Sequence, residues 1–241
     1  MSAHISTTLK VVSLAVSLSF GAFAQAADPV TDLMQAANAP YRMALYKTNG
    51  KSQEEAQHAL LQAQQMWGKL ATEFGAKPAA PYDRDPAFAG SVAEVGKVYD
   101  QALKEVGAGQ LSTAHNTLER VRDVMADMRQ RNNVVVFSDH MNAYHSQMEL
   151  IQVHGGETLA QPKGALLLTA QTGALSYLGK QLEVQAPASL KKNEEFNQLL
   201  KAVNQSVGTL EAALLNQDMA AAKEAAGKLK GPYSKLFAKF G

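Results

Sequence analysis

The sequence predicts an all-α fold of eight helices, arranged as two tandem antiparallel four-helix bundles. Helix-breaking segments such as Asn49-Gly50, residues 75–86 and residues 154–164 interrupt the chain at regular intervals. Between the breaks, apolar residues recur in alternating steps of three and four, which gathers them on one face of a helix. No comparable run shows the period of two that marks a half-buried strand.

The first four expected helices cover residues 29–47, 52–75, 86–107 and 110–131. Two of their starts carry capping signals. Ser52 and Glu55 have the spacing of a capping box, in which each side chain accepts a hydrogen bond from the backbone of the other residue. Asp85 provides a capping carboxylate before Pro86, and proline suits the first helical position because no N–H is needed there.

The last four expected helices cover residues 134–154, 163–183, 189–215 and 218–240. Short loops join most of the helices and indicate antiparallel neighbours. Asn132-Asn133 is the expected boundary between an N-terminal domain, residues 27–132, and a C-terminal domain, residues 133–241. Pro232 lies inside the final helix, and we expect a kink there because proline lacks an N–H and its ring clashes with the preceding turn.

Residues 1–26 have the pattern of a secretory signal peptide. Lys10 precedes an apolar run that is too short to span a bilayer comfortably, and Ala24 to Ala26 have the small-x-small spacing of a cleavage site. No other stretch approaches the ~20 apolar residues of a membrane-spanning helix. We therefore expect a soluble periplasmic protein without a membrane anchor.

Charge and cysteine content exclude several classes of partner. Removing residues 1–26 takes away Lys10 from the 23 basic residues, which leaves 22 against 22 acidic ones. Nucleic acids and anionic membranes attract proteins with a basic excess, so neither is an expected partner. The chain has no cysteine, which excludes disulfides, thiolate metal sites and covalently attached haem.

The segment "ALLNQDMAAAKEAAGKLKGPYSKLFAKFG", residues 213–241, resembles the closing hairpin of the soluble cytochrome b562 and cytochrome c′ group. The resemblance implies an exported four-helix bundle that binds haem through a histidine of the last helix. Phe237 stands at that position here, and no histidine follows His154. Two blocks of the first half, residues 40–49 and 129–145, resemble uncharacterised exported helical proteins and imply no activity.

Residues 134–154, "VVVFSDHMNAYHSQMELIQVH", hold the first candidate metal site. At about 100° per residue, Met141 lies on the apolar stripe of this helix, and His145 lies beside that stripe with Glu149. Met141, His145 and either Met148 or Glu149 can therefore converge on an ion. Thioether and imidazole suit copper, whereas imidazole and carboxylate suit zinc. The alternative is a core methionine next to a solvated His–Glu pair.

His115 and Glu119 repeat the His-x-x-x-Glu spacing on the preceding helix. If the two flanks face each other, both histidines and both glutamates can coordinate one metal ion. The alternative is a structural network in which Arg122 neutralises Glu119 beside His115 and Tyr144.

Motifs for nucleophilic catalysis, for phosphate binding and for zinc or calcium enzymes are absent from the sequence, so an enzyme is not expected. The prediction is a non-enzymatic periplasmic binding or accessory protein that holds a transition metal through His145, Met141 and Glu149, joined by His115 and Glu119. A haem-binding electron carrier with atypical ligands is one alternative. A structural adaptor for another exported protein is the other.

Overall fold

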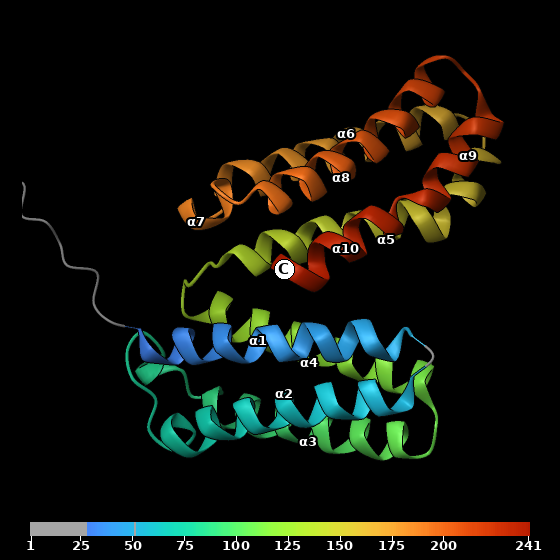
Figure 1. Ribbon diagram of the computed structural model, residues 1–241. Coiled ribbons are helices and arrows are strands. Elements are labelled where there is room, and N and C mark those ends of the chain that lie inside the picture. The colour runs from blue at the N-terminus through green and yellow to red at the C-terminus, as the bar shows by residue number, and fades with distance from the viewer. Residues whose placement is uncertain (1–27, 51) are drawn as a thin grey trace, which may run out of the picture.

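The computed structural model describes residues 28–50 and 52–241 (Figure 1). The predicted signal peptide, residues 1–26, lies outside these residues. The described chain consists of helices and their connections and contains no strand, which confirms the predicted all-α fold class. Within it, no helix combines the length and the apolar character that a membrane crossing needs.

The first bundle, as we call it, is formed by α1 (Pro29–Thr48), α2 (Gln53–Phe74), α3 (Phe88–Gly107) and α4 (Leu111–Arg131), with a short 3-10 helix η1 (Tyr82–Arg84) before α3. α1 packs against α2 and α4, and α3 packs against the same two helices. Their buried side chains form one hydrophobic cluster, which runs from Val30 to Met128.

The second bundle is formed by α5 (Phe137–Leu159), α6 (Gly164–Gln185), α7 (Ala188–Lys191), α8 (Glu194–Leu215), α9 (Met219–Lys228) and α10 (Lys230–Phe240). α6 packs against α5 and α8, while α9 and α10 each pack against the same two helices from the other side. A separate hydrophobic cluster runs from Met141 to Leu236. That each half of the chain folds as a domain of its own stays a prediction.

The start of α2 uses one half of the predicted capping box. The Ser52 hydroxyl accepts a hydrogen bond from the Glu55 N–H at 3.3 Å. The Glu55 carboxylate turns to the Lys47 ammonium of α1, at 3.0 Å. The carboxylate therefore ties the two ends of the α1–α2 loop together.

The predicted helix start at Asp85-Pro86 is wrong by two residues, because α3 begins at Phe88. The Asp85 carboxylate accepts a hydrogen bond from the Ala87 N–H at 2.9 Å, so it does bind the chain just before the helix. It also pairs with the Arg131 guanidinium at 3.0 Å. Asp85 thus fixes the α2–α3 loop to the end of α4.

Two predicted helices are divided in the structure. The expected helix 189–215 is α7 followed by α8, because the Asn193 side chain accepts from the Phe196 N–H at 3.0 Å and starts a new helix. The expected helix 218–240 breaks at Leu229 into α9 and α10. Pro232 lies four residues after Lys228. Because proline has no N–H and its ring clashes with the carbonyl four residues earlier, the Lys228 carbonyl receives no helical hydrogen bond from Pro232. The predicted kink is confirmed.

The connection between the bundles is a tight helix end followed by a buried ion pair. α4 ends at Asn132-Asn133, where Asn133 adopts a left-handed φ of 55° and the Val134 N–H bonds the Arg129 carbonyl at 2.9 Å. The Arg129 side chain is only 3% exposed, and its Nε lies 3.1 and 3.0 Å from the two carboxylate oxygens of Asp139. Asp139 also accepts from the Val136 N–H at 3.0 Å, which starts α5.

α10 links the two bundles. Figure 1 shows α5 and α10 on the side of the second bundle that faces α1 and α4. Phe237 packs against both hydrophobic clusters. Two side chains of α1 bind the end of α10: the Asn38 amide donates to the Gly241 carbonyl at 3.0 Å, and the Arg42 guanidinium donates to the Lys239 carbonyl at 3.3 Å.

We expect Arg129→Met to lower the free energy of unfolding by about 3 kcal/mol, because it leaves the partly buried Asp139 carboxylate without its cation. The matched control is Arg120→Met on the same helix, which removes an exposed pair with Glu94 and should cost much less, because an exposed ion pair contributes little to stability. Urea unfolding of both variants measures the difference. Equal losses would show that the junction does not depend on this ion pair.

Candidate functional site

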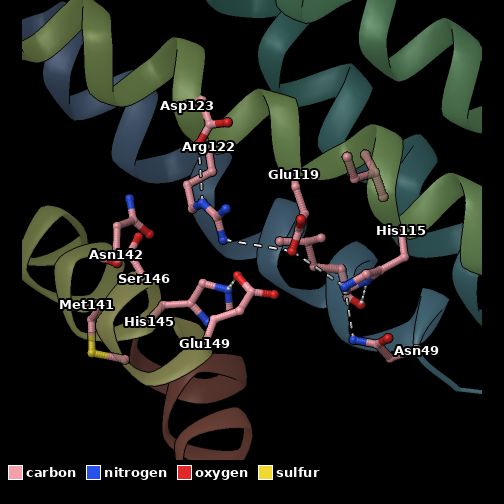
Figure 2. Close-up of polar contacts among 12 residues, drawn as sticks. Asn49, His115, Glu119, Arg122, Asp123, Met141, Asn142, His145, Ser146 and Glu149 are labelled. Carbon is pink, nitrogen blue, oxygen red and sulfur yellow. Dashed lines mark hydrogen bonds and ion pairs between the residues drawn. The ribbon is translucent and has the colours of Figure 1, made fainter. Parts of the chain in front are cut away.

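A pocket of ≈ 200 Å³ lies between α1, α4, α5 and α10, where the two bundles meet. We call it the inter-bundle pocket. Its lining consists of the polar residues Asn49, His115, Glu119, Arg122, His145, Lys230 and Ser234 and the largely apolar residues Leu45, Tyr46, Tyr233 and Phe237. Three of the five predicted site residues, His115, Glu119 and His145, therefore line one pocket. Figure 2 shows the polar side chains that α4 and α5 direct toward it.

His115 is held in place by the end of α1. Its Nδ1 lies 3.1 Å from the Leu45 carbonyl, and its Nε2 lies 3.2 Å from the amide nitrogen of Asn49. A carbonyl oxygen only accepts, so Nδ1 carries the proton and Nε2 accepts from Asn49. Burial lowers the pKa of His115, and the nearby Glu119 carboxylate offsets part of this effect. His115 is thus a neutral imidazole of fixed orientation.

Arg122 and Glu119 are three residues apart on α4 and lie side by side in the pocket wall without close contact. The Arg122 Nη1 lies 3.9 Å from the Glu119 carboxylate, and its Nε lies 3.5 Å from that of Asp123. Both separations exceed the 2.7–3.2 Å of a protein N–H···O hydrogen bond. The Arg122 side chain is only 16% exposed. A largely buried guanidinium is therefore left with donors that the described residues do not use at close range.

His145 enters the pocket wall from α5 with both ring nitrogens buried. Neither nitrogen has a hydrogen-bond partner within residues 28–50 and 52–241, and the nearest carboxylate oxygen, of Glu149, is 3.6 Å from Nε2. Burial lowers the pKa of His145 to about 4, with the Arg122 charge acting in the same direction. The imidazole is therefore neutral at pH 7 and lacks the hydrogen bonds that a buried polar group normally makes.

α10 provides an aromatic wall behind His145. The His145 ring lies on Tyr233, with centroids 5.4 Å apart, and Tyr233 stacks in turn on Phe237 at 5.9 Å. The Tyr233 hydroxyl donates to the Met141 carbonyl at 3.0 Å, which fixes the ring against α5. The His145 imidazole thus packs against a fixed aromatic surface of α10.

The structure places the other two predicted metal ligands elsewhere. Met141 is fully buried in the second hydrophobic cluster, and Figure 2 shows its side chain directed away from the His145 ring. The Glu149 side chain is 46% exposed at the edge of the site. In the described part of the chain, no group of three or more His, Asp or Glu side chains is placed to hold a metal ion. That these residues hold a copper or zinc ion stays a prediction, and Met141 and Glu149 do not line the inter-bundle pocket.

Haem fits the pocket no better. Phe237, which stands where the cytochrome resemblance implies an axial histidine, lines the pocket with a ring that cannot ligate iron. The volume of ≈ 200 Å³ is on the scale of a single ring, since a cavity of about 150 Å³ holds benzene. A porphyrin contains four rings and needs far more space.

Sequence reasoning missed the contribution of α10. Lys230, Tyr233 and Ser234 line the pocket because the chain breaks at Leu229, and Pro232 was the only local signal for that break. The alternative network predicted around Arg122 is present in part, since Glu119 and His115 lie beside it. Tyr144 does not join that network, because it is buried in the second cluster and stacks on Tyr233 at 5.3 Å.

We expect His145→Phe to raise the free energy of unfolding by about 1 kcal/mol at pH 7.5, because it removes two unsatisfied buried nitrogens and keeps a ring on Tyr233. The control is His58→Phe at an exposed position of α2, which should change stability by less than about 0.5 kcal/mol. Urea unfolding measures both. A loss of stability in His145→Phe would mean that the imidazole nitrogens stabilise the fold.

The stability of the wild type should also fall more steeply with acid than that of His145→Phe. Because burial holds the folded-state pKa of His145 near 4, below its ordinary 6.5, the unfolded chain binds the proton first. Stability is then lost between pH 6.5 and 4, by up to about 3 kcal/mol. The charged or titratable groups facing His145 are Glu149 on α5, Arg122 and His115 on α4, and Lys230 on α10. Parallel pH profiles of the two proteins would contradict this prediction.

Comparisons with protein-family models, with curated proteins and with solved structures find no match to this chain. The resemblance of residues 213–241 to the cytochrome b562 and cytochrome c′ group therefore stays a prediction. The chemistry of the inter-bundle pocket is the basis on which a function can be assigned.

Proposed function

We propose that this protein is a non-enzymatic periplasmic binding protein whose ligand is a small molecule held in the inter-bundle pocket. The periplasmic part of the proposal rests on the export signal that the sequence predicts for residues 1–26. The binding part rests on the pocket, and on one side chain in particular.

His145 carries the proposal. Its two nitrogens are buried in the pocket wall and have no partner among the described residues, although His115 a short distance away has partners for both of its nitrogens. Leaving a buried polar group unsatisfied costs roughly 1–3 kcal/mol. A ligand that exchanges hydrogen bonds with His145 removes this cost, which explains why a histidine stands at a position where phenylalanine fits.

The protonation state of His145 favours binding over catalysis. A general base works best when its pKa lies near the operating pH. Burial puts the pKa of His145 near 4, so the imidazole is a weak base at neutral pH. It remains a good hydrogen-bonding group, because a neutral imidazole donates through one nitrogen and accepts through the other.

A second candidate function, the structural adaptor, is favoured by the outer face of α6. Leu166, Tyr177 and Val184 are 70%, 62% and 52% exposed. Their spacings of 11 and 7 residues place them on one line along the helix. An adaptor that acts through this face leaves the inter-bundle pocket without a role, so an experiment on the pocket separates the two functions.

The imidazole signals of the mature chain in NMR spectra provide that experiment. The probes are neutral, acidic and basic single-ring compounds, and Zn²⁺ and Cu⁺, each added separately. We expect the single-ring compounds to shift the signals of His145 and His115. The exposed His58 and His154 serve as internal controls and should not move.

The matched variants are Ser234→Phe and Lys235→Phe. The first places a ring in the pocket, and the second places the same ring on the exposed face of the same helix. Ser234→Phe should abolish the shifts, and Lys235→Phe should preserve them. If no compound or ion moves His145 and His115, or if Ser234→Phe binds as the wild type does, the pocket is not the binding site.

A further inference from the structure

We propose that the ligand of the inter-bundle pocket is a small organic anion, a carboxylate on a body about the size of one ring. This inference rests on the proposed binding function and names the class of ligand. Its carboxylate is placed between Arg122 of α4 and Lys230 of α10, and its ring against Tyr233 and Phe237.

The fixed charges of the lining favour an anion. Arg122 and Lys230 are positive and Glu119 is negative, and the two histidines are neutral at pH 7, so the lining carries one net positive charge. The positive charges of Arg122 and Lys230 act on both histidines of the pocket. After burial, both Arg122 and Lys230 are among the causes that lower the pKa values of His115 and His145.

The N–H donors of Arg122 and Lys230 make no close hydrogen bonds with other described side chains. The Arg122 guanidinium keeps its carboxylate neighbours at 3.5 and 3.9 Å, longer than hydrogen-bond distance. For Lys230, the structure of residues 28–50 and 52–241 gives the side chain neither an ion pair nor a hydrogen bond. An arginine fork matches the two oxygens of a carboxylate, and the neutral His145 can donate one further hydrogen bond to the same group.

The apolar surface and the volume set the size of the anion. Leu45 and the stacked rings of Tyr233 and Phe237 provide the apolar part of the pocket lining. A volume of ≈ 200 Å³ accommodates one ring with a carboxylate, given that about 150 Å³ holds benzene. Free inorganic anions would leave the apolar wall in contact with water, so a ligand with an apolar body gains more from this pocket.

The same groups disfavour cations. A divalent metal or an amine in the pocket would meet Arg122 and Lys230, and among the lining residues only Glu119 carries a negative charge. The Glu119 carboxylate already lies near two other groups, 3.9 Å from the Arg122 Nη1 and 3.8 Å from the His115 Nε2. The pocket that the sequence suggested for a metal ion is thus better suited to the opposite charge.

Three compounds of similar size and different charge test this inference: benzoate, benzamide and benzylamine. They are titrated at pH 7 into the mature chain while the His145 signal is followed by NMR. We expect benzoate to bind about tenfold more tightly than benzamide, the difference that a charge-assisted hydrogen bond provides. Benzylamine should bind most weakly. The preference for benzoate should shrink as salt is added, because salt screens the partly exposed Lys230.

Variants identify the groups responsible. Arg122→Gln should make the affinities for benzoate and benzamide equal, and Lys230→Gln should reduce the preference for benzoate several-fold. The matched control is Arg120→Gln on the same helix, where the guanidinium is exposed and paired with Glu94 at 2.7 Å away from the pocket. It should leave all three affinities unchanged. Lys230 is partly exposed and outside the hydrophobic clusters, so its variant answers the question even if Arg122→Gln folds poorly.

The outcomes separate this inference from the binding function on which it rests. If benzamide or benzylamine moves the His145 signal at concentrations as low as benzoate does, the pocket binds small molecules and the assignment to anions is wrong. The assignment is equally wrong if both Arg122→Gln and Lys230→Gln keep the preference. If none of the three compounds binds, the assignment fails, and the wider set of fragments and ions decides whether the pocket binds anything.

Discussion

Pro232 changes the course of the final helix, and the position of α10 that follows decides where the two bundles meet. Without the break at Leu229, the residues from Lys230 onward would continue along the axis of α9. In the structure they lie against α1 as well as α5, and Phe237 packs against both hydrophobic clusters. The contact between the bundles and the wall of the pocket are therefore products of the same local constraint on the backbone.

The wall of the pocket buries the two ring nitrogens of His145 without giving them a hydrogen-bond partner among the described residues. A protein interior normally pairs its buried polar groups, and exceptions concentrate where a ligand or a reaction uses them. Two of the seven buried side-chain atoms without a partner in the described residues are the His145 nitrogens, and the Arg122 guanidinium on α4, which is 16% exposed, makes only loose contacts with its carboxylate neighbours. Stability could be gained at this site by apolar substitution, which is the pattern expected where binding conflicts with stability.

Much of the fold could be predicted from the sequence because helix position depends on local periodicity. The apolar stripes located the main helices, Ser52 marked a start, and Pro232 marked a break. The same periodicity correctly placed His115, Glu119 and His145 beside the stripes rather than in them, which is why they reach an interface. The predicted start of α3 was wrong because the expected capping residue, Asp85, pairs with Arg131 instead.

The composition of the site could not be predicted, because it depends on contacts between residues far apart in the chain. His115 and Lys230 meet through the packing of two bundles, and no local pattern encodes their distance. The helical projection did place Met141 on the apolar stripe beside His145, and Met141 is fully buried in the core. The buried pair of Arg129 and Asp139 is a further example, since its residues lie on opposite sides of the junction.

The inter-bundle pocket takes its lining from both halves of the chain, so it exists only while the halves are docked. Whatever binds there is in thermodynamic terms a third partner of the interface, and its binding free energy adds to that of docking. Because linkage is reciprocal, a ligand of the pocket strengthens docking by the same factor by which docking strengthens the binding of that ligand. If the proposed ligand binds there, occupancy of the pocket and docking of the two bundles are coupled equilibria, and a small molecule contributes to the contact between two much larger bundles.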